Sequence, residues 1–149
     1  MIQRIQTLYL LAVVALGIAL IWLPVLQFTT PDGQLYSLTA LGGAPLQGLW
    51  GLTLTTILIP LMALIDIFLF KKRLLQARLN IFSVMLCLGY YGIMGIYVWH
   101  CKANLHFDPL NWHMTASMMI PVICFVLTLM ATRRILKDEA LVRAADRIR

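Results

Sequence analysis

Four long apolar stretches are the feature that most constrains how this chain folds. Asp66 is the one formally charged residue inside them, and they run over residues 7–28, 49–70, 79–99 and 114–132. Each is close to the roughly 20 residues that a helix needs to cross a bilayer core. Because backbone groups in lipid must be hydrogen-bonded within their own segment, helices are the predicted structure. The sequence therefore predicts an integral membrane protein with four spans.

The first apolar run is distinguishable from a secretory signal peptide. It extends over residues 8–26, whereas the apolar core of a signal peptide is usually about 7–15 residues long. No Ala-x-Ala cleavage pattern follows it before the polar loop. We therefore expect this run to be a retained span.

The basic residues are distributed very unevenly between the two sides of the predicted spans. Lys102 stands alone on one side, and the other eleven of the 12 Lys and Arg residues stand on the opposite side: Arg4, Lys71, Lys72, Arg73, Arg78, Arg133, Arg134, Lys137, Arg143, Arg147 and Arg149. Cationic loops stay in the cytoplasm, which places both termini and the middle loop there. The net charge of +6 thus reports orientation, and it gives no reason to expect a nucleic-acid partner.

The tryptophans support the same topology independently. Trp22, Trp50, Trp99 and Trp112 all fall at the non-cytoplasmic ends of the spans, and indole side chains favour the membrane interface. The connections 71–78 and 100–113 are short, so consecutive spans are expected to pair as hairpins. The fold predicted is an all-α membrane protein, with residues 1–132 forming an up-down-up-down four-helix bundle.

The tail over residues 133–149 is predicted to continue the fourth span as a cytoplasmic, charged, amphipathic helix. Glu139 and Arg143 stand four residues apart in the favourable order for a helix, and Leu141, Ala145 and Ile148 form a narrow apolar strip. Its candidate docking or lipid-facing residues are Arg133, Arg134, Lys137, Glu139, Arg143 and Arg147. The alternative is a solvated extension that only anchors the topology.

Asp66 is the candidate intramembrane polar site, because an ionisable residue within a span is a functional hypothesis by default. It could hold a proton or a cation. It also lies five residues before Lys71, about a turn and a half from the cytoplasmic interface. The structural alternative, which the position favours, is a salt bridge with Arg4, Arg73 or Arg78.

Gly89, Gly92 and Gly95 form a candidate helix-packing face on the third span. Small residues let two helix backbones approach closely in lipid. We expect this face to pack against another helix inside the bundle, and the alternative is a helix of a partner protein.

The remaining reactive residues give weak signals. His100, His106 and His113 gather around the second outer loop and are weak candidates for a metal site, but their spacing matches no compact metal signature. Cys87 and Cys124 lie at matching depths and are interpreted as neighbours with a packing role. We therefore expect no metal and no other cofactor.

Two terminal segments resemble a known family. They are Met1-Ile2-Gln3-Arg4-Ile5-Gln6-Thr7-Leu8-Tyr9-Leu10-Leu11 and the tail from Arg133-Arg134-Ile135-Leu136-Lys137 to Arg147-Ile148-Arg149. With the length and span layout, they are similar to the domain of unknown function 4293, a family of small four-span membrane proteins of Bacteroidota. The resemblance implies a protein of the bacterial inner membrane with cytoplasmic ends, and it implies no activity.

The leading functional hypothesis is a non-enzymatic accessory or scaffold subunit of a larger inner-membrane assembly, whose partners are the lipid bilayer and other membrane-protein subunits. No catalytic motif is present, so we expect no enzyme. One alternative is a small transporter or channel, formed as a homo-oligomer and using Asp66. A weaker alternative is a metal- or haem-binding membrane redox protein.

Overall fold

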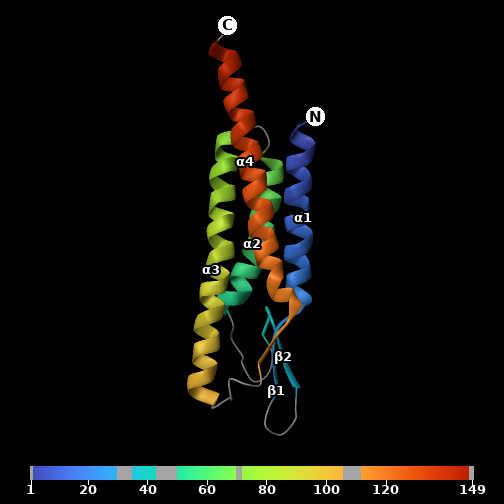
Figure 1. The fold of residues 1–149 in the computed structure, drawn as a ribbon, viewed down its shortest axis with the longest axis vertical. Coiled ribbons are helices and arrows are strands. Elements are labelled where there is room, and N and C mark those ends of the chain that lie inside the picture. The colour runs from blue at the N-terminus through green and yellow to red at the C-terminus, as the bar shows by residue number, and fades with distance from the viewer. Residues whose placement is uncertain (1, 30–34, 43–49, 70–71, 106–111, 148–149) are drawn as a thin grey trace.

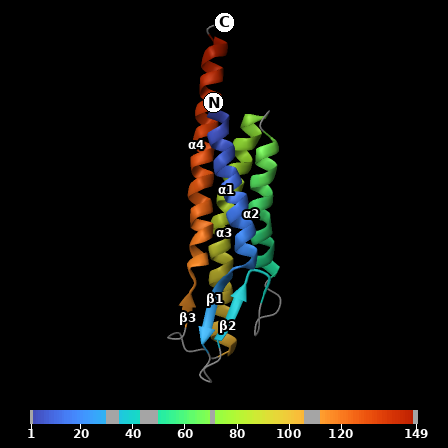
Figure 2. The ribbon, with the colours of Figure 1, turned by 90° about the vertical axis from the view of Figure 1, so that its right-hand side faces the viewer.

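The computed structural model of this chain describes the backbone of residues 2–29, 35–42, 50–69, 72–105 and 112–147. Its long helices are α1 (Ile2–Trp22), α2 (Trp50–Phe68), α3 (Arg73–Leu105) and α4 (Ile120–Arg147). They lie side by side along the long axis of the molecule (Figures 1 and 2). All four are long and apolar enough to cross a membrane, in agreement with the four predicted spans.

The two ends of the bundle differ. The N- and C-termini lie toward one end, called here the terminal end, where α2 also leads into α3 (Figure 1). A small β-sheet lies at the opposite end, called here the sheet end. The protein is therefore a helical bundle with helix ends at its terminal end and a small sheet at its sheet end.

The helices pack in a ring, in which each one contacts its neighbours in the chain and α4 closes onto α1. Two hydrogen bonds show that α2 and α3 run antiparallel. At the terminal end, Gln76 Nε2 donates to the backbone oxygen of Asp66 at 2.8 Å. At the sheet end, the Gly51 N–H donates to the Tyr97 hydroxyl at 3.4 Å. The two helices thus form an antiparallel hairpin.

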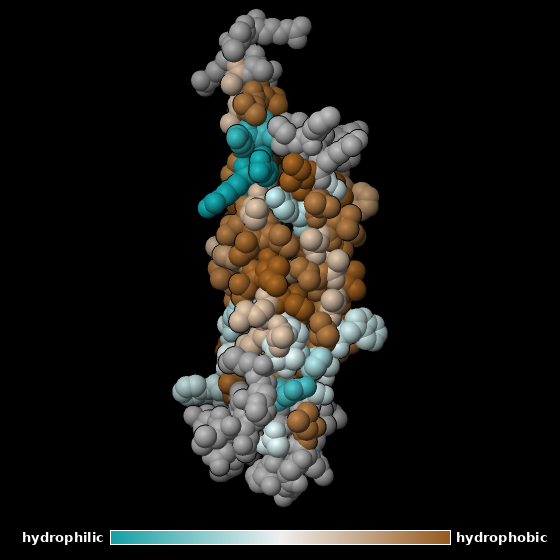
Figure 3. All heavy atoms as spheres, turned by 45° about the vertical axis from the view of Figure 1, so that its right-hand side comes forward, coloured by the Kyte–Doolittle hydropathy of each residue, from teal (hydrophilic) through white to brown (hydrophobic). Residues whose placement is uncertain are grey.

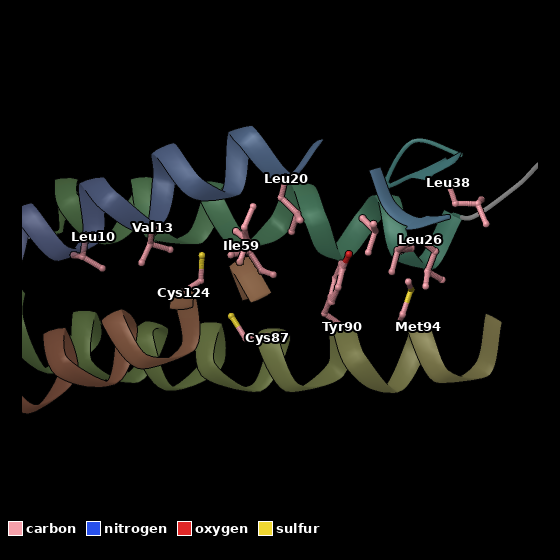
Figure 4. Packing of buried hydrophobic residues seen from close by; sticks show 14 of the residues in the cluster. Leu10, Val13, Leu20, Leu26, Leu38, Ile59, Cys87, Tyr90, Met94 and Cys124 are labelled. Carbon is pink, nitrogen blue, oxygen red and sulfur yellow. The ribbon is translucent and has the colours of Figure 1, made fainter. Parts of the chain in front are cut away.

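The interior is built from one regular row of buried residues on each helix. Along every row the spacing alternates between three and four residues. The rows are, on α1, Gln6, Leu10, Val13, Gly17 and Leu20; on α2, Leu52, Thr56, Ile59, Ala63 and Asp66; on α3, Gln76, Asn80, Ser83, Cys87, Tyr90 and Met94; and on α4, with Ser117 just before it, Pro121, Cys124, Thr128, Ala131 and Ile135. This seven-residue repeat keeps one narrow face of each helix turned toward the bundle axis. Figure 4 shows side chains from all four rows meeting there.

A small β-sheet, which the sequence did not predict, accompanies the four helices. Strands β1 (Pro24–Thr29), β2 (Leu35–Thr39) and β3 (Trp112–Met114) pair antiparallel in the order β2-β1-β3. Leu26 stands opposite both Leu38 and Met114. Segments that the sequence assigns to the first span and to two loops therefore form one small cap at the sheet end (Figure 2).

The first span is shorter than predicted, because the helix ends at Trp22 rather than near residue 28. Pro24 has no N–H to continue a helix, and it opens β1 instead of lying within a span. Its carbonyl oxygen accepts a hydrogen bond from the Ser117 hydroxyl. That contact joins the start of the sheet to the short 3₁₀ helix η2 (Ala116–Met119), which precedes α4.

The third and fourth helices are longer than their apolar spans. α3 begins at Arg73 instead of residue 79 and continues to Leu105, while α4 begins at Ile120 and continues to Arg147. Hydropathy marks only the part of a helix that matches the bilayer core, and charged residues extend the helix beyond it. Pro121 occupies the first turn of α4, where its missing N–H disturbs no helical hydrogen bond.

The outer surface of the bundle is apolar along the middle of its length, and charged side chains of α4 gather near the terminal end (Figure 3). Large side chains such as Leu54, Ile81, Phe82 and Val126 are exposed there. Trp22, Trp50 and Trp99 are 75%, 83% and 79% exposed near the sheet end, and the side chain of Trp112 lies outside the described residues. An apolar belt of this extent suits lipid contact.

Candidate functional site

Asp66 lies in the last turn and a half of α2, and its side chain points into the interior. The residue is 0% exposed. Neither carboxylate oxygen has a hydrogen-bond partner within the described part of the chain. Arg78, one of the three proposed salt-bridge partners, is exposed on α3, and the side chains of Arg4 and Arg73 lie outside the described residues. The structure therefore places Asp66 as a buried carboxyl group with no hydrogen-bond partner among the described residues.

Three polar residues of α3 lie in the interior at the same end of the bundle. Gln76, Asn80 and Ser83 are 3%, 0% and 3% exposed, and they occupy consecutive positions of the buried row. Gln76 is bound to the backbone of Asp66. Both side-chain polar atoms of Asn80, and the Ser83 hydroxyl, have no hydrogen-bond partner among the described residues.

Buried threonines elsewhere in the bundle are satisfied in the ordinary way. The hydroxyls of Thr56, Thr128 and Thr132 donate to backbone oxygens four residues earlier, at 2.8, 2.7 and 2.8 Å. Such hydroxyls need no further partner. The contrast distinguishes Asp66, Asn80 and Ser83, whose polar atoms have no hydrogen-bond partner among the described residues.

Sequence reasoning identified Asp66 but missed Asn80 and Ser83. The sequence contained a signal for them, since both are polar residues at positions of the buried row of α3, where apolar residues are expected. Tyr90 follows on the same row and is fully buried, and its hydroxyl is also unpaired within the described part of the chain. The interior face of α3 is therefore more polar than its average hydropathy indicates.

The candidate packing face at Gly89, Gly92 and Gly95 points away from the bundle, which corrects the expected internal packing. All three are exposed, and a Cβ atom added at any of them meets no heavy atom within 4 Å. They lie on the opposite side of α3 from its buried row, because residues 87, 90 and 94 fix which side faces the axis. The alternative, packing against a helix of another protein, stays a prediction.

The two described cysteines lie in the interior. Cys87 on α3 and Cys124 on α4 are buried and free, and their side chains enter the same region of the core (Figure 4). The histidine candidates fall outside the described residues: this applies to all of His106 and to the side chains of His100 and His113. Among the residues that are described, no group of three or more His, Cys, Asp or Glu could hold a metal ion.

The charged tail is the outer part of α4. Ile135 is the last buried residue of that helix, and the described side chains beyond it are exposed or half-buried. This segment extends past the ends of the other helices (Figure 1). Its charged residues Lys137, Asp138 and Glu139 come directly after the bundle, and exposed Leu141 and Val142 follow them.

Four apolar helices around a common core, with an apolar outer belt, define a multi-pass membrane protein. The family model of the domain of unknown function DUF4293 matches residues 2–148. The chain belongs to this family, which confirms the resemblance found at its two ends. No curated protein and no solved structure matches it.

Proposed function

We propose that this protein is a non-enzymatic accessory subunit of a larger assembly in the bacterial inner membrane, with both termini in the cytoplasm. The observation that carries the proposal is the segment of α4 beyond Ile135. Residues 136–147 form a helix that stands clear of the bundle, about 18 Å long at the usual helical rise. Leu141 and Val142 on it are 55% and 42% exposed.

A helical segment of this length is poorly stabilised by its own hydrogen bonds. Isolated helices below about 12–15 residues are marginal in water, and most helices in proteins are held by packing of an apolar face. Continuity with α4 removes the cost of starting the helix but leaves Leu141 uncovered. We infer that a cytoplasmic segment of another membrane-protein subunit covers it.

The outward glycines of α3 support the same proposal from within the membrane. Gly89, Gly92 and Gly95 leave a shallow strip on the lipid-facing side of α3, and small residues are enriched where membrane helices pack closely. A transmembrane helix of the partner fits this strip. One partner could then contact the protein both in the membrane and along the extended tail.

The proposal is tested by purifying the tagged protein from native membranes in a mild detergent and identifying its partners by mass spectrometry. We expect one or more stoichiometric membrane proteins. Leu141→Asp should release them, while Leu141→Met, which keeps an apolar side chain, should retain them. Ala140→Asp adds the same charge about 100° around the helix and serves as the matched control. Recovery of the wild-type chain without a stoichiometric partner would refute the accessory role.

A second candidate is a small oligomeric transporter or channel, which the buried and unpaired carboxyl group of Asp66 favours. Intramembrane carboxyl groups often mark ion or proton pathways. This candidate is tested by ion flux in proteoliposomes with the wild type and Asp66→Asn. Absence of flux in the wild type, or equal flux in both, removes it.

A further inference from the structure

The polar group at the terminal end of the bundle has the composition of a small ion-binding site. It consists of Asp66 on α2 and of Asn80 and Ser83 on α3. The three side chains are almost completely buried, and their five polar atoms lack hydrogen-bond partners in the described part of the chain. Buried polar atoms are nearly always paired with protein, water or an ion. Such a set of buried polar atoms, on two helices that pack together, therefore calls for a ligand.

The fold directs Asp66 and Asn80 toward one another, and Ser83 follows Asn80 three residues deeper on the same buried row. The bond from Gln76 to the backbone of Asp66, 2.8 Å long, places the first turn of α3 beside the end of α2. Asn80 follows Gln76 by one turn, about 6 Å deeper into the bundle. Helical side chains lean toward the N-terminus of their own helix. Because α2 and α3 are antiparallel, the Asp66 side chain leans deeper into the bundle, whereas the Asn80 side chain leans back toward the terminal end. The two side chains therefore reach the same level along the bundle axis.

The chemistry of the group selects the ligand. Asp66 supplies two carboxylate oxygens, Asn80 an amide oxygen and Ser83 a hydroxyl oxygen, and oxygen donors of this kind suit hard cations. One carboxylate balances one positive charge. A divalent ion would keep an unbalanced charge in a region of low dielectric constant, which is costly. The group thus favours a cation with a single charge.

Among the described side chains, the charged groups around the site leave this position to a ligand, and the side chains of Arg4, Lys71 and Arg73 lie outside that part of the chain. Lys72, directly before α3, and Arg78 on α3 are exposed, so their cationic ends face away from the interior. On the helices packed against the site, the described buried residues nearest the terminal end are Gln6 of α1 and Thr128, Ala131, Thr132 and Ile135 of α4, all uncharged. No described cationic side chain therefore neutralises Asp66.

We propose that Asp66, Asn80 and Ser83 bind a monovalent metal cation such as Na⁺ between α2 and α3. The site goes beyond the proposed accessory role and does not rest on it, since a bound cation stabilises the hairpin whatever the protein contacts. It would also supply the binding step for the transport candidate, but binding alone requires no flux.

The proposal is tested on the full-length protein purified in detergent without alkali cations. Binding of radiolabelled sodium is measured at equilibrium, and thermal unfolding is followed in sodium chloride and in choline chloride at matched ionic strength. We expect saturable binding and a melting temperature that rises with sodium and not with choline. Asp66→Asn should abolish both effects. Asn80→Ala should weaken binding about tenfold, the usual consequence of losing one contact to a charged group.

Two further variants keep the test decisive. Ser83→Ala removes one oxygen and little volume, so it should fold and bind sodium several-fold more weakly even if Asp66→Asn does not fold. Thr56→Val is the matched control, because the Thr56 hydroxyl is buried in the same interior but already bonded to Leu52, and it should bind as the wild type does. Absence of saturable binding in the wild type, equal binding in Ser83→Ala, or stability that responds to protons but not to sodium would overturn the proposal. Since partner recovery is measured separately, failure of the ion site and failure of the accessory role are distinguishable.

Discussion

Gly17 of α1 lies directly against the ring of Pro60 in α2. A Cβ atom built at Gly17 would stand 2.9 Å from both Cβ and Cδ of the proline, closer than such carbon atoms approach in proteins. Both residues belong to the buried part of their helices. This contact sets how closely α1 and α2 pack, and it depends on the missing side chain of the glycine.

Gly17→Ala should therefore destabilise the bundle. The added methyl group forces α1 away from the rigid proline ring, and overpacking of this kind costs about 1–3 kcal/mol. Thermal or denaturant unfolding in detergent measures the change. Gly92→Ala is the matched control, because its added methyl group meets no heavy atom within 4 Å. An equal loss of stability in both variants would mean that helix geometry, and not the Gly17–Pro60 contact, determines the effect.

The Tyr91 hydroxyl should contribute to holding α3 against η2, the short 3₁₀ helix that precedes α4. It donates to the backbone oxygen of Met118 at 2.6 Å. Tyr91→Phe should lower the free energy of unfolding by about 0.5–1.5 kcal/mol, the usual value of one hydrogen bond. Tyr97→Phe removes a longer bond, in which the tyrosine oxygen accepts from Gly51 at 3.4 Å. It should cost less, and the reverse order would contradict this account of the two contacts.

Replacement of Asp66 by an apolar residue distinguishes between two interpretations of this residue, an unpaired carboxyl group and one member of a salt bridge. In sodium-free buffer, Asp66→Leu should raise the free energy of unfolding by about 1–3 kcal/mol, because an unsatisfied buried polar group is removed. Loss of one member of a buried ion pair would instead destabilise the protein by about 3–5 kcal/mol. Denaturant titration of the two proteins in the same detergent decides between these outcomes, and a large destabilisation would restore the salt-bridge interpretation.

The proposed orientation in the membrane is tested by labelling single cysteines in intact cells with a membrane-impermeant maleimide. Ser37 on β2 and Lys137 on α4 are both exposed and lie toward opposite ends of the molecule. With Cys101 replaced by serine, Ser37→Cys should react once the outer membrane is permeable, and Lys137→Cys only after the inner membrane is disrupted. The opposite pattern would invert the topology.

Much of the fold could be predicted because apolar length is a local property. Four spans followed from hydropathy, and α2 ends within two residues of its predicted boundary. The sheet could not be predicted in this way, since residues 24–29 are as apolar as a continued helix. What decides their conformation is pairing with β2 and with β3, which is nearly 90 residues away in the chain.

The candidate site was predicted only where a single residue is conspicuous. Asp66 stands out as a charge in a span, whereas Asn80 and Ser83 become informative only once the buried row of α3 is known. The same row explains the error at Gly89, Gly92 and Gly95. Small residues predicted close packing, but their presence does not show which side of a helix faces the core. The buried positions of Cys87 and Tyr90 show that side, and the glycines lie away from it.

If the protein works as part of a larger membrane assembly, the mass of the particle extracted from the membrane should show it. Native mass spectrometry of the protein taken from its own membrane into nanodiscs would resolve each component. We expect a complex of the 16.9 kDa chain with at least one different membrane protein in fixed ratio. A particle that contains only this chain, as a monomer or as a homo-oligomer, would contradict it.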